Sequence, residues 1–375
     1  MSLSGKTDNP SFVLRGIHDT VYEDRPIPEL GPKDVLIEVK KTGICASLPM
    51  NIPHGRIGNF VLDKPMCLGH ESAGYVHSVG SEVTTHKKGD AVALEPGATC
   101  MRCEYCKGGK YNLCPDVIFA ATPPFTLGTL CRYYKLPHEL VYTLPDTCTL
   151  EDGAMIEPLA VGIHSVAKLG KFQTGQNIVV FGAGPVGLLC MAVAKALGAK
   201  RIIAVDINAE RLAFAKSYVA TDIFQPPPPN PNEARPDFSK RAADAMMSEL
   251  HIETRGWDAI DLVIEATGAE PCVQMGLHLV KPAGTFVQVG MGAPNLVIPM
   301  YLVAGKELGV FGSFRYGPGD YPMAISLVAR GLIDLKPLVT HRFKFEEAVK
   351  AFGVTQNGKD EDGKSAIKCI IDGPE

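Results

Sequence analysis

Short apolar runs separated by polar turns dominate the first part of the chain. DVLIEV (34–39) and DAVALE (90–95) are two of these runs, and glycine, proline and charged residues lie between them. Runs of this length and spacing are typical of β-strands joined by tight turns. The pattern therefore predicts a mainly β domain over residues 1–157.

The pattern changes after residue 157. NIVVFGAG (177–184) is typical of a buried strand, an alanine-rich amphipathic stretch follows it as far as Gly198, and RIIAVDI (201–207) is typical of a second strand. A strand, a helix and a strand within roughly 30 residues form a βαβ unit, which requires a parallel sheet. We expect an α/β domain to begin here.

Further apolar strands at AIDLVIEATG (259–268) and GTFVQVG (284–290) continue the alternation, which predicts a doubly wound Rossmann sheet over residues 158–295. The proline-rich segment QPPPPNPNEARP (225–236) interrupts it. Four consecutive prolines cannot continue a helix, so we expect a surface loop inside this domain, with a linker between domains as the alternative. Residues 296–375 follow as a mixed segment.

The composition is that of a globular protein acting on small molecules. Of the 375 residues, 46% are hydrophobic and 21% charged, and the net charge is -4. A chain of this length can bury two cores, and its charge favours neither nucleic acid nor an anionic membrane as a partner. The first residues lack the features of a signal peptide, and no apolar stretch approaches roughly 18 residues, so we expect a cytoplasmic protein.

Four of the eleven cysteines lie within fifteen residues. Cys100, Cys103, Cys106 and Cys114 can complete a tetrahedral zinc shell with no open position, which predicts a structural zinc lobe. An iron–sulfur cluster and unbound core cysteines are the alternatives. An odd number of cysteines without an export signal makes a disulfide framework the weaker interpretation. The scattered cysteines are expected to pack in the core: Cys67, Cys131, Cys148, Cys190, Cys272 and Cys369.

A glycine pattern follows the first strand of the α/β domain. Gly182, Gly184 and Gly187 fit G-x-G-x-x-G at the start of a helix, and Asp206 ends the next strand. The first glycine allows the tight turn, the second lets the backbone approach a pyrophosphate, and the third lets the helix pack on the strand. Asp206 can accept hydrogen bonds from both ribose hydroxyls and would repel a 2′-phosphate. The motif therefore predicts NAD rather than NADP, with an ordinary glycine-rich turn as the alternative.

Three dispersed segments offer a second set of metal ligands. Cys45, His70 with Glu71, and Glu157 supply the cysteine, histidine and carboxylate groups that hold zinc with one position open. Zinc in such a site polarises a hydroxyl group, and NAD held beside it accepts hydride, so the set points to alcohol oxidation. A buried cysteine with an unrelated surface histidine is the alternative.

Several longer strings resemble the zinc-containing medium-chain dehydrogenases over nearly the whole chain: GHESAGYVHSVG (69–80), EPLAVGIH (157–164) and VVFGAGPVGLL (179–189). Within that family, HGRIGNFVLDKPMCLGHESAG (54–74) and GSFRYG (312–317) resemble the polyol branch, which includes sorbitol and fungal xylitol dehydrogenases. The resemblance implies oxidation of a secondary hydroxyl of a polyol to a ketose, with xylitol to xylulose as the first expectation.

The resemblance also implies an architecture. A GroES-like catalytic domain is expected from residues 1–157 and 296–375, with the structural zinc lobe at about 95–115 and the Rossmann domain over 158–295 between the two parts. Members of this family are usually homotetramers or homodimers, so a homo-oligomer is expected here. The small-molecule partners would be a polyol and its ketose.

Site residues transfer from the resemblance position by position. Cys45, His70 and Glu71 match catalytic zinc ligands, and Glu157 matches an acid that ligates zinc or hydrogen-bonds its water. Ser47 is expected to polarise the substrate hydroxyl. Two residues match substrate contacts: Arg315 and Tyr316. The positions that match NAD contacts are Val186, Asp206, Arg211, Val289, Gly290, Met291 and Phe314.

One segment departs from the family pattern. The family reads GICGSD followed by an apolar residue, His and Tyr, whereas this chain carries Leu48, Met50 and Asn51 at the acid, His and aromatic positions. Losing an acid that orients a zinc-bound His typically costs about 10–100-fold in metal affinity or activity. We expect His54 to be a surface residue, with a substitute proton carrier as the alternative. The departure keeps two alternatives open, which are a zinc alcohol dehydrogenase or carbonyl reductase with a less polar substrate, and an NAD-binding protein with impaired catalysis.

Overall fold

Strand β20 (Lys368–Asp372) pairs with β3 (Asp34–Gly43) and so joins two distant parts of the chain. The computed structural model describes residues 7–45, 56–57 and 60–375. The chain forms a first unit, Met1–Glu157 with Gly317–Glu375, and a second unit, Pro158–Tyr316. Each unit has its own sheets and its own buried core.

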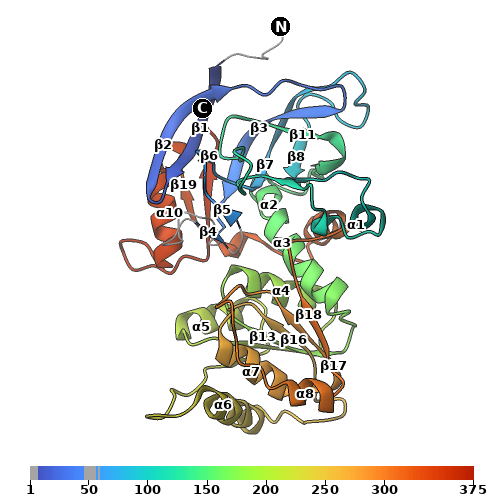
Figure 1. Cartoon of the computed structure of the whole chain (residues 1–375), viewed down its shortest axis with the longest axis vertical. Helices are drawn as coiled ribbons and strands as arrows, with labels where there is room; N and C mark the ends of the chain where they lie inside the picture. The colour runs from blue at the N-terminus through green and yellow to red at the C-terminus, as the bar shows by residue number, and fades with distance from the viewer. Residues whose placement is uncertain (1–6, 46–55, 58–59) are drawn as a thin grey trace. The chain divides into compact units, whose positions relative to one another are not determined.

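The main sheet of the first unit has seven strands and carries the predicted metal ligands of residues 45 and 70–71. Its strand order is β12-β8-β7-β3-β20-β19, and β11 pairs with β3. Figure 1 labels β3, β7, β8, β11 and β19 of this sheet. All described strand pairs in it are antiparallel except β19 with β20. The other strands of this sheet are β7 (Glu71–Val79), β8 (Ala91–Leu94), β11 (Tyr133–Pro137), β12 (Val141–Thr143) and β19 (Val339–Phe343).

Smaller sheets and short helices complete the first unit. The remaining strands are β1 (Thr7–Gly16), β2 (Asp19–Pro26), β4 (Arg56–Ile57), β5 (Phe60–Val61), β6 (Met66–Cys67), β9 (Gly97–Ala98) and β10 (Ile118–Phe119). The helices are α1 (Glu104–Lys107), α2 (Leu150–Ala154), α9 (Asp320–Ala329) and α10 (Ala348–Asn357), and α3 (Ile156–Ile163) crosses into the second unit. Short 3-10 turns are η2 (Tyr111–Leu113), η3 (His138–Leu140), η5 (Lys336–Leu338) and η6 (Phe345–Glu347).

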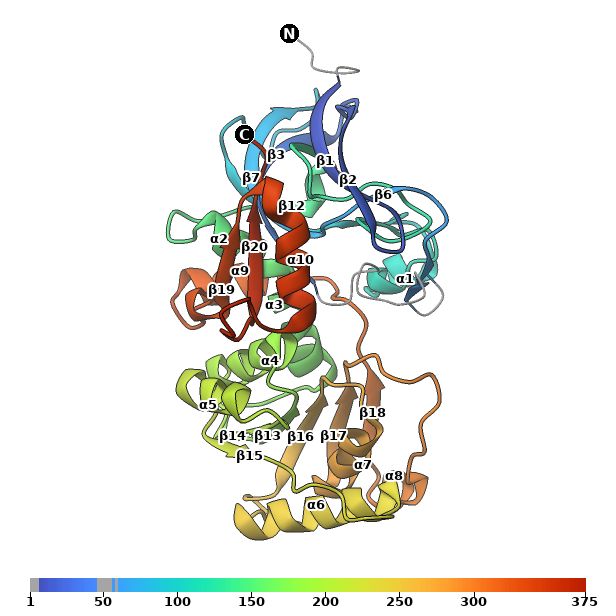
Figure 2. The same ribbon diagram turned by 90° about the vertical axis from the view of Figure 1, so that its left-hand side faces the viewer.

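The second unit is a six-stranded parallel sheet with the strand order β15-β14-β13-β16-β17-β18 (Figure 2). This is the dinucleotide-binding order, in which the chain reverses direction across the sheet between β13 and β16. The strands are β13 (Asn177–Phe181), β14 (Arg201–Val205), β15 (Asp222–Phe224), β16 (Ile260–Glu265), β17 (Val280–Gln288) and β18 (Gly309–Gly312). The helical segments are the π-helix η4 (His164–Leu169), α4 (Pro185–Ala196), α5 (Ala209–Tyr218), α6 (Arg235–Glu249), α7 (Glu270–Leu279) and α8 (Met300–Gly305).

Both α6 and α7 pack against the sheet through small and apolar side chains. Ala242, Ala243 and Met246 of α6 share one buried cluster with Val273 of α7 and Phe286 of β17. Burial of this apolar surface holds the helices against the sheet and so stabilises the strands whose carboxyl ends carry the cofactor loops.

The expected Rossmann fold and mainly β domain are confirmed, but one expected boundary is wrong. The sequence predicts that segment 296–316 is part of the catalytic domain, whereas it belongs to the second unit. The reason is β18, which pairs in parallel with β17 and so adds a sixth strand to the sheet. The proline-rich segment 225–236 is confirmed as part of the second unit, where it joins β15 to α6.

Across the part of the chain that the structure describes, no helix has both the length and the apolar character needed to cross a bilayer.

Candidate metal centre and cofactor site

The turn between β13 and α4 has the backbone that a dinucleotide requires. Gly182 has φ 93°, a left-handed conformation that glycine adopts without strain. A Cβ on Gly187 would collide with the carbonyl oxygen of Gly182, whereas a Cβ on Gly184 would meet no protein atom within 4 Å. The space beside Gly184 is therefore open on the side from which a phosphate group would approach the helix N-terminus.

Asp206 lies directly after β14 and is held by two backbone groups. Its Oδ2 accepts a hydrogen bond from Ala183 N at 2.8 Å, and its Oδ1 accepts one from Asn208 N at 2.9 Å. Arg211 follows in the first turn of α5, where its own N–H donates to the capping side chain of Asn208. The carboxylate is thus fixed against the glycine turn, the position that a ribose-binding acid needs.

Glu265 at the end of β16 was not among the predicted site residues. Its carboxylate accepts hydrogen bonds from the N–H groups of Thr267 and Gly268, both at 2.8 Å, and burial raises its pKa. Its backbone carbonyl accepts from Val289 and Gly290, at 2.8 and 2.9 Å. Glu265 therefore ties together two loops at the carboxyl edge of the sheet. An acid at the end of the apolar strand AIDLVIE was the available signal.

The remaining predicted cofactor and substrate residues lie in the second unit. Met291 is exposed on the loop after β17, and Phe314 follows β18. The Arg315 guanidinium lies 4.7 Å from the Phe314 ring centroid, and the Arg315 backbone is left-handed, with φ 56°. Tyr316 is buried. The roles given to these four residues stay predictions.

The structure brings Cys45, His70 and Glu71 together. One potential ligand atom from each of these residues lies within 4.8 Å of the others. Cys45 follows β3, His70 precedes β7, and the pairing of Gly43 with Glu71 aligns the two strands. Antiparallel pairing therefore converts a separation of 25 residues in sequence into one cluster of ligands.

Glycine at two positions makes this cluster possible. Gly69 has φ 89°, and a Cβ there would approach Leu130 N to 2.7 Å. A Cβ on Gly43 would collide with the Glu71 carboxylate. Gly69 therefore excludes larger residues on both steric and conformational grounds, and a larger residue at position 43 would require the Glu71 carboxylate to move.

His70 has a buried ring nitrogen, Nδ1, with no hydrogen-bond partner among the described residues. A buried polar atom of this kind normally has a partner, so the atom marks a place for a ligand or for a group not described. Ser47, Leu48, Met50, Asn51 and His54 lie outside the described residues, and the expectations attached to them stay predictions.

Glu157 lies at the start of α3 and is only 6% exposed. It is not a member of the three-residue ligand group, but it lies close enough for its ionisation to respond to that group. Burial raises the pKa of Glu157 to about 8, the charge of His70 opposes this, and the charge of Glu71 adds to it. A carboxyl group with this pKa can hold or release a proton near neutral pH.

Lys368 is the residue of the cluster that the sequence did not reveal. It is 3% exposed and forms an ion pair with Glu71, which is 1% exposed. Burial lowers the pKa of Lys368, but the charges of Glu71 and Cys45 outweigh burial and raise it above its ordinary value. The only signal was a lysine inside the apolar strand AIKCII (366–371).

Four thiols form a second group of potential ligands. One sulfur each from Cys100, Cys103, Cys106 and Cys114 lies within 4.8 Å of the others. Backbone N–H groups of Cys103 and Cys106 donate to the sulfurs of Cys100 and Cys103 at 3.3 and 3.4 Å. Such bonds stabilise thiolates, and backbone donors lower the pKa of Cys100 to about 6. The donors and their spacing fit tetrahedral zinc with no open position.

A buried carboxylate fastens this four-cysteine lobe to the main sheet. Glu95 follows β8, and its two oxygens accept hydrogen bonds from Tyr111 of the lobe at 2.6 Å and from Tyr142 of β12 at 2.7 Å. Burial raises the pKa of Glu95.

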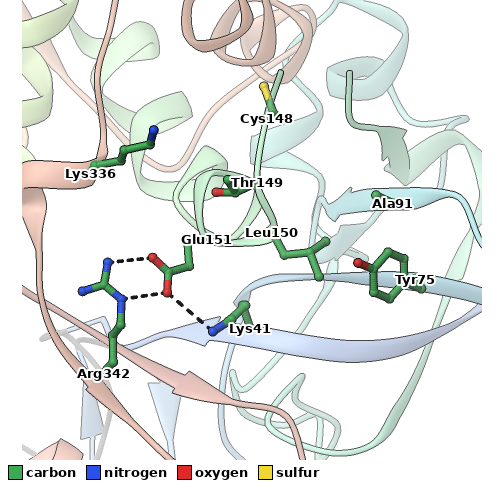
Figure 3. Close-up of a pocket in the computed structure, with 9 residues that line it drawn as sticks. All are labelled: Lys41, Tyr75, Ala91, Cys148, Thr149, Leu150, Glu151, Lys336 and Arg342. Carbon is green, nitrogen blue, oxygen red and sulfur yellow. Dashed lines mark hydrogen bonds and ion pairs between the residues drawn. The ribbon is translucent and has the colours of Figure 1, made fainter. Parts of the chain in front are cut away.

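A separate cavity of about 530 Å³ contains none of the cluster residues. Figure 3 shows Glu151 at its centre, bridging Arg342 and Lys41. Arg342 binds Glu151 through two hydrogen bonds of 2.8 Å, and Lys41 lies 3.5 Å from the same carboxylate. These ion pairs brace β3, α2 and β19. The other residues that line the cavity are Tyr75, Ala91, Cys148, Thr149, Leu150 and Lys336.

A cysteine, a histidine and a carboxylate whose potential ligand atoms lie within 4.8 Å of one another fit zinc with an open position. Two family models match the chain: the alcohol dehydrogenase GroES-like domain over residues 31–146, and the zinc-binding dehydrogenase domain over 185–330. The chain therefore belongs to the zinc-binding dehydrogenases, which are oxidoreductases.

Relatives match this chain over nearly its whole length. A probable D-xylulose reductase A of Aspergillus clavatus is 49% identical over 375 residues, which is 100% of this chain and 99% of the relative. D-xylulose reductase A of Aspergillus niger is 50% identical over 366 residues, with 97% of each chain covered. The structure of Escherichia coli L-idonate 5-dehydrogenase superposes with a TM-score of 0.83 at 28% identity, covering 97% of this chain and 98% of that one.

Proposed function

We propose that this protein oxidises a secondary hydroxyl of a polyol to a ketose with NAD, and that xylitol and D-xylulose are its preferred pair. The observation that carries the proposal is the meeting of Cys45, His70 and Glu71 beside the buried acid Glu157. Two full-length relatives named as D-xylulose reductases support the choice of substrate.

The chain's own residues have separate parts in this proposal. Cys45, His70 and Glu71 would hold a zinc ion, which polarises the substrate hydroxyl when bound, while NAD accepts the hydride. Glu157 holds or releases the proton near neutral pH. Ser47 would hydrogen-bond the reacting hydroxyl. Arg315 and Tyr316 would contact the rest of the polyol.

The second unit supports NAD as the cofactor. The open space at Gly184 admits a pyrophosphate group, and the fixed carboxylate of Asp206 would accept hydrogen bonds from a ribose. The expected contacts at Val186, Arg211 and Val289 lie on the same edge of the sheet or on the helices that follow it.

The test is a substrate panel combined with metal analysis. We expect two zinc ions per chain and NADH formation from xylitol, with sorbitol and arabinitol as weaker substrates and NADP as a poorer acceptor. Activity on apolar alcohols but not on polyols would favour the alternative of a less polar substrate, which Leu48 and Met50 suit. One zinc ion per chain, NAD binding and no activity on any alcohol would contradict the proposal.

We propose that the protein is a homo-oligomer whose dimer contact is β18. This strand ends the parallel sheet, and no described strand pairs with its outer edge. Val310 and Phe311 on β18 and Tyr301 on α8 are exposed apolar side chains, an arrangement that favours pairing with another strand. The same edge of a second copy would complete the sheet around a two-fold axis, and a tetramer would need a further contact.

The molar mass in solution, measured by light scattering after size-exclusion chromatography, tests this contact. Val310→Asp combined with Phe311→Asp should shift the protein to monomer, whereas the control Val349→Asp on α10 should not. An unchanged mass in the double variant, or a monomeric wild-type protein, would contradict the proposal.

We also propose a cytoplasmic location, because a reducing compartment preserves the four thiols of the lobe. Imaging of a fluorescent fusion protein tests this location.

A further inference from the structure

Lys368 lies beside the proposed zinc ligands and has no part in the proposed reaction. It lies on β20, which pairs with β3 beside Gly43, two residues before Cys45. Its ion pair with Glu71 packs over Gly43, where a Cβ would collide with the carboxylate and lie 3.1 Å from Lys368 Cε. The fold thus makes room for an ammonium group next to a predicted zinc ligand.

A buried lysine requires a compensating partner, because removing its charge from water costs several kcal/mol. Glu71 is that partner, and without Lys368 it would be an uncompensated buried carboxylate in the metal-free protein. A zinc ion held by Cys45, His70 and Glu71 would provide the same compensation with two positive charges. Zinc and Lys368 are therefore alternative counter-cations of one carboxylate.

We propose that Lys368 is a positioning residue that stands in for zinc at Glu71, stabilising the cluster without metal and weakening its hold on the metal. The proposal rests on the zinc site of the proposed function. Two effects act in the same direction. The ammonium lowers the free energy of the metal-free protein by neutralising Glu71, and it repels zinc once zinc is bound. Both effects lower zinc affinity.

The consequence is a catalytic zinc that binds less tightly than its ligands alone would allow. The four-cysteine lobe has no such cation in its ligand group, since its members are all thiols. The chain therefore carries an internal reference, because a change at Lys368 should alter one zinc site and leave the other unchanged.

Zinc competition against a chromogenic chelator tests the proposal on the full-length protein. Lys368→Met should raise the affinity of the catalytic zinc about tenfold, on the scale of effects seen when a group behind a zinc ligand is changed. The affinity of the four-cysteine site should not change, and the metal-free variant should melt at a lower temperature than metal-free wild type. Lys368→Arg keeps the charge and should restore the wild-type zinc affinity.

The control is Lys281→Met, which removes a lysine paired with Asp261 in the second unit and should leave both zinc affinities unchanged. If Lys368→Met does not fold, Lys368→Gln keeps a hydrogen-bond donor to Glu71 and should also bind zinc more tightly than wild type. Unchanged or weaker catalytic zinc binding in the neutral variants would overturn the inference. A wild-type protein with a single zinc ion would instead overturn the zinc site of the proposed function, and the inference with it.

Discussion

Asp206 Oδ2 accepts a hydrogen bond from the backbone N–H of Ala183 at 2.8 Å, so the acid after β14 is anchored to the turn after β13. The two strands are neighbours in the parallel sheet. The relationship links the group that would recognise ribose to the turn that would receive the pyrophosphate, and it orients the carboxylate before any cofactor binds.

Replacing Asp206 should therefore change cofactor choice. Asp206→Ser should lower kcat/KM with NAD about 10–100-fold, because hydrogen bonds to a charged group are worth about 1.5–3 kcal/mol. The ratio of NADP to NAD activity should rise, since the charge that repels a 2′-phosphate is gone. The measurement is steady-state kinetics with both cofactors. The control is Asp222→Asn, which alters an ion pair between Asp222 on β15 and Arg201 on the neighbouring strand β14. It should leave the ratio unchanged.

Two glycines of the same turn should behave differently when changed to alanine. Gly187→Ala forces a Cβ against the Gly182 carbonyl and should destabilise the second unit by about 3 kcal/mol. Gly184→Ala meets no protein atom, so its melting temperature should stay close to wild type while its affinity for NADH falls about tenfold. Thermal melting and fluorescence titration with NADH separate the two effects. A stable Gly187→Ala protein would show that the turn is less tightly packed than described.

The ion pair of Arg342 with Glu151 should contribute modestly to stability. Arg342→Gln should lower the free energy of unfolding by about 0.5–1 kcal/mol at neutral pH, because half of the arginine side chain is exposed. Hydrogen bonds from Arg342 hold the pKa of Glu151 below its ordinary value of 4.5. The stabilisation is therefore present above pH 4.5 and is lost as the pH falls through the lowered pKa, so the variant and wild type should converge in acid.

Urea unfolding across this pH range is the measurement for Arg342→Gln. Lys350→Gln, which removes an exposed pair with Glu361 at 3.8 Å, should show no difference from wild type at any pH. A constant difference between Arg342→Gln and wild type down to strong acid would mean that lost packing rather than charge is responsible.

Restoring the family's acid at position 48 should strengthen the metal site. In the family pattern the acid at this position orients the zinc-bound His, and His70 Nδ1 has no partner among the described residues. We therefore expect Leu48→Asp to raise zinc affinity or activity by about 10–100-fold. Adding Met50→His should raise the rate of proton release further. Leu48→Asn is the control for shape without charge. If neither Leu48→Asp nor the double variant with Met50→His gains zinc affinity or activity, the site has been rebuilt for another substrate.

The sequence predicted best those features that are local. The glycine turn and Asp206 lie within 25 residues of one another, and the regular alternation of strands and helices makes their relation predictable. The four cysteines of the lobe are equally close in sequence. The ligands Cys45, His70 and Glu157 came from residue type and family resemblance, because nothing in their spacing alone brings them together.

Contacts between residues far apart in the sequence cannot be predicted from local patterns. Lys368 is more than 300 residues from Cys45 in sequence, and a single lysine in an apolar strand resembles an edge residue until the pairing of β20 with β3 is known. The predicted boundary between residues 295 and 296 is wrong for a similar reason. The strand GVFG (309–312) is too short and too rich in glycine to predict, yet it is the sixth strand of the parallel sheet.

The position of β20 also bears on how the protein is made. A ribosome synthesises the whole parallel sheet before residues 368–372, so the edge of β3 that pairs with β20 has no partner while the second unit is being made. Lys368 arrives on that late strand, and until it does, Glu71 has no ammonium beside it. The ligand cluster is thus finished only after the second unit has been synthesised, and a chain stopped before residue 368 would be a candidate for degradation rather than a slow enzyme.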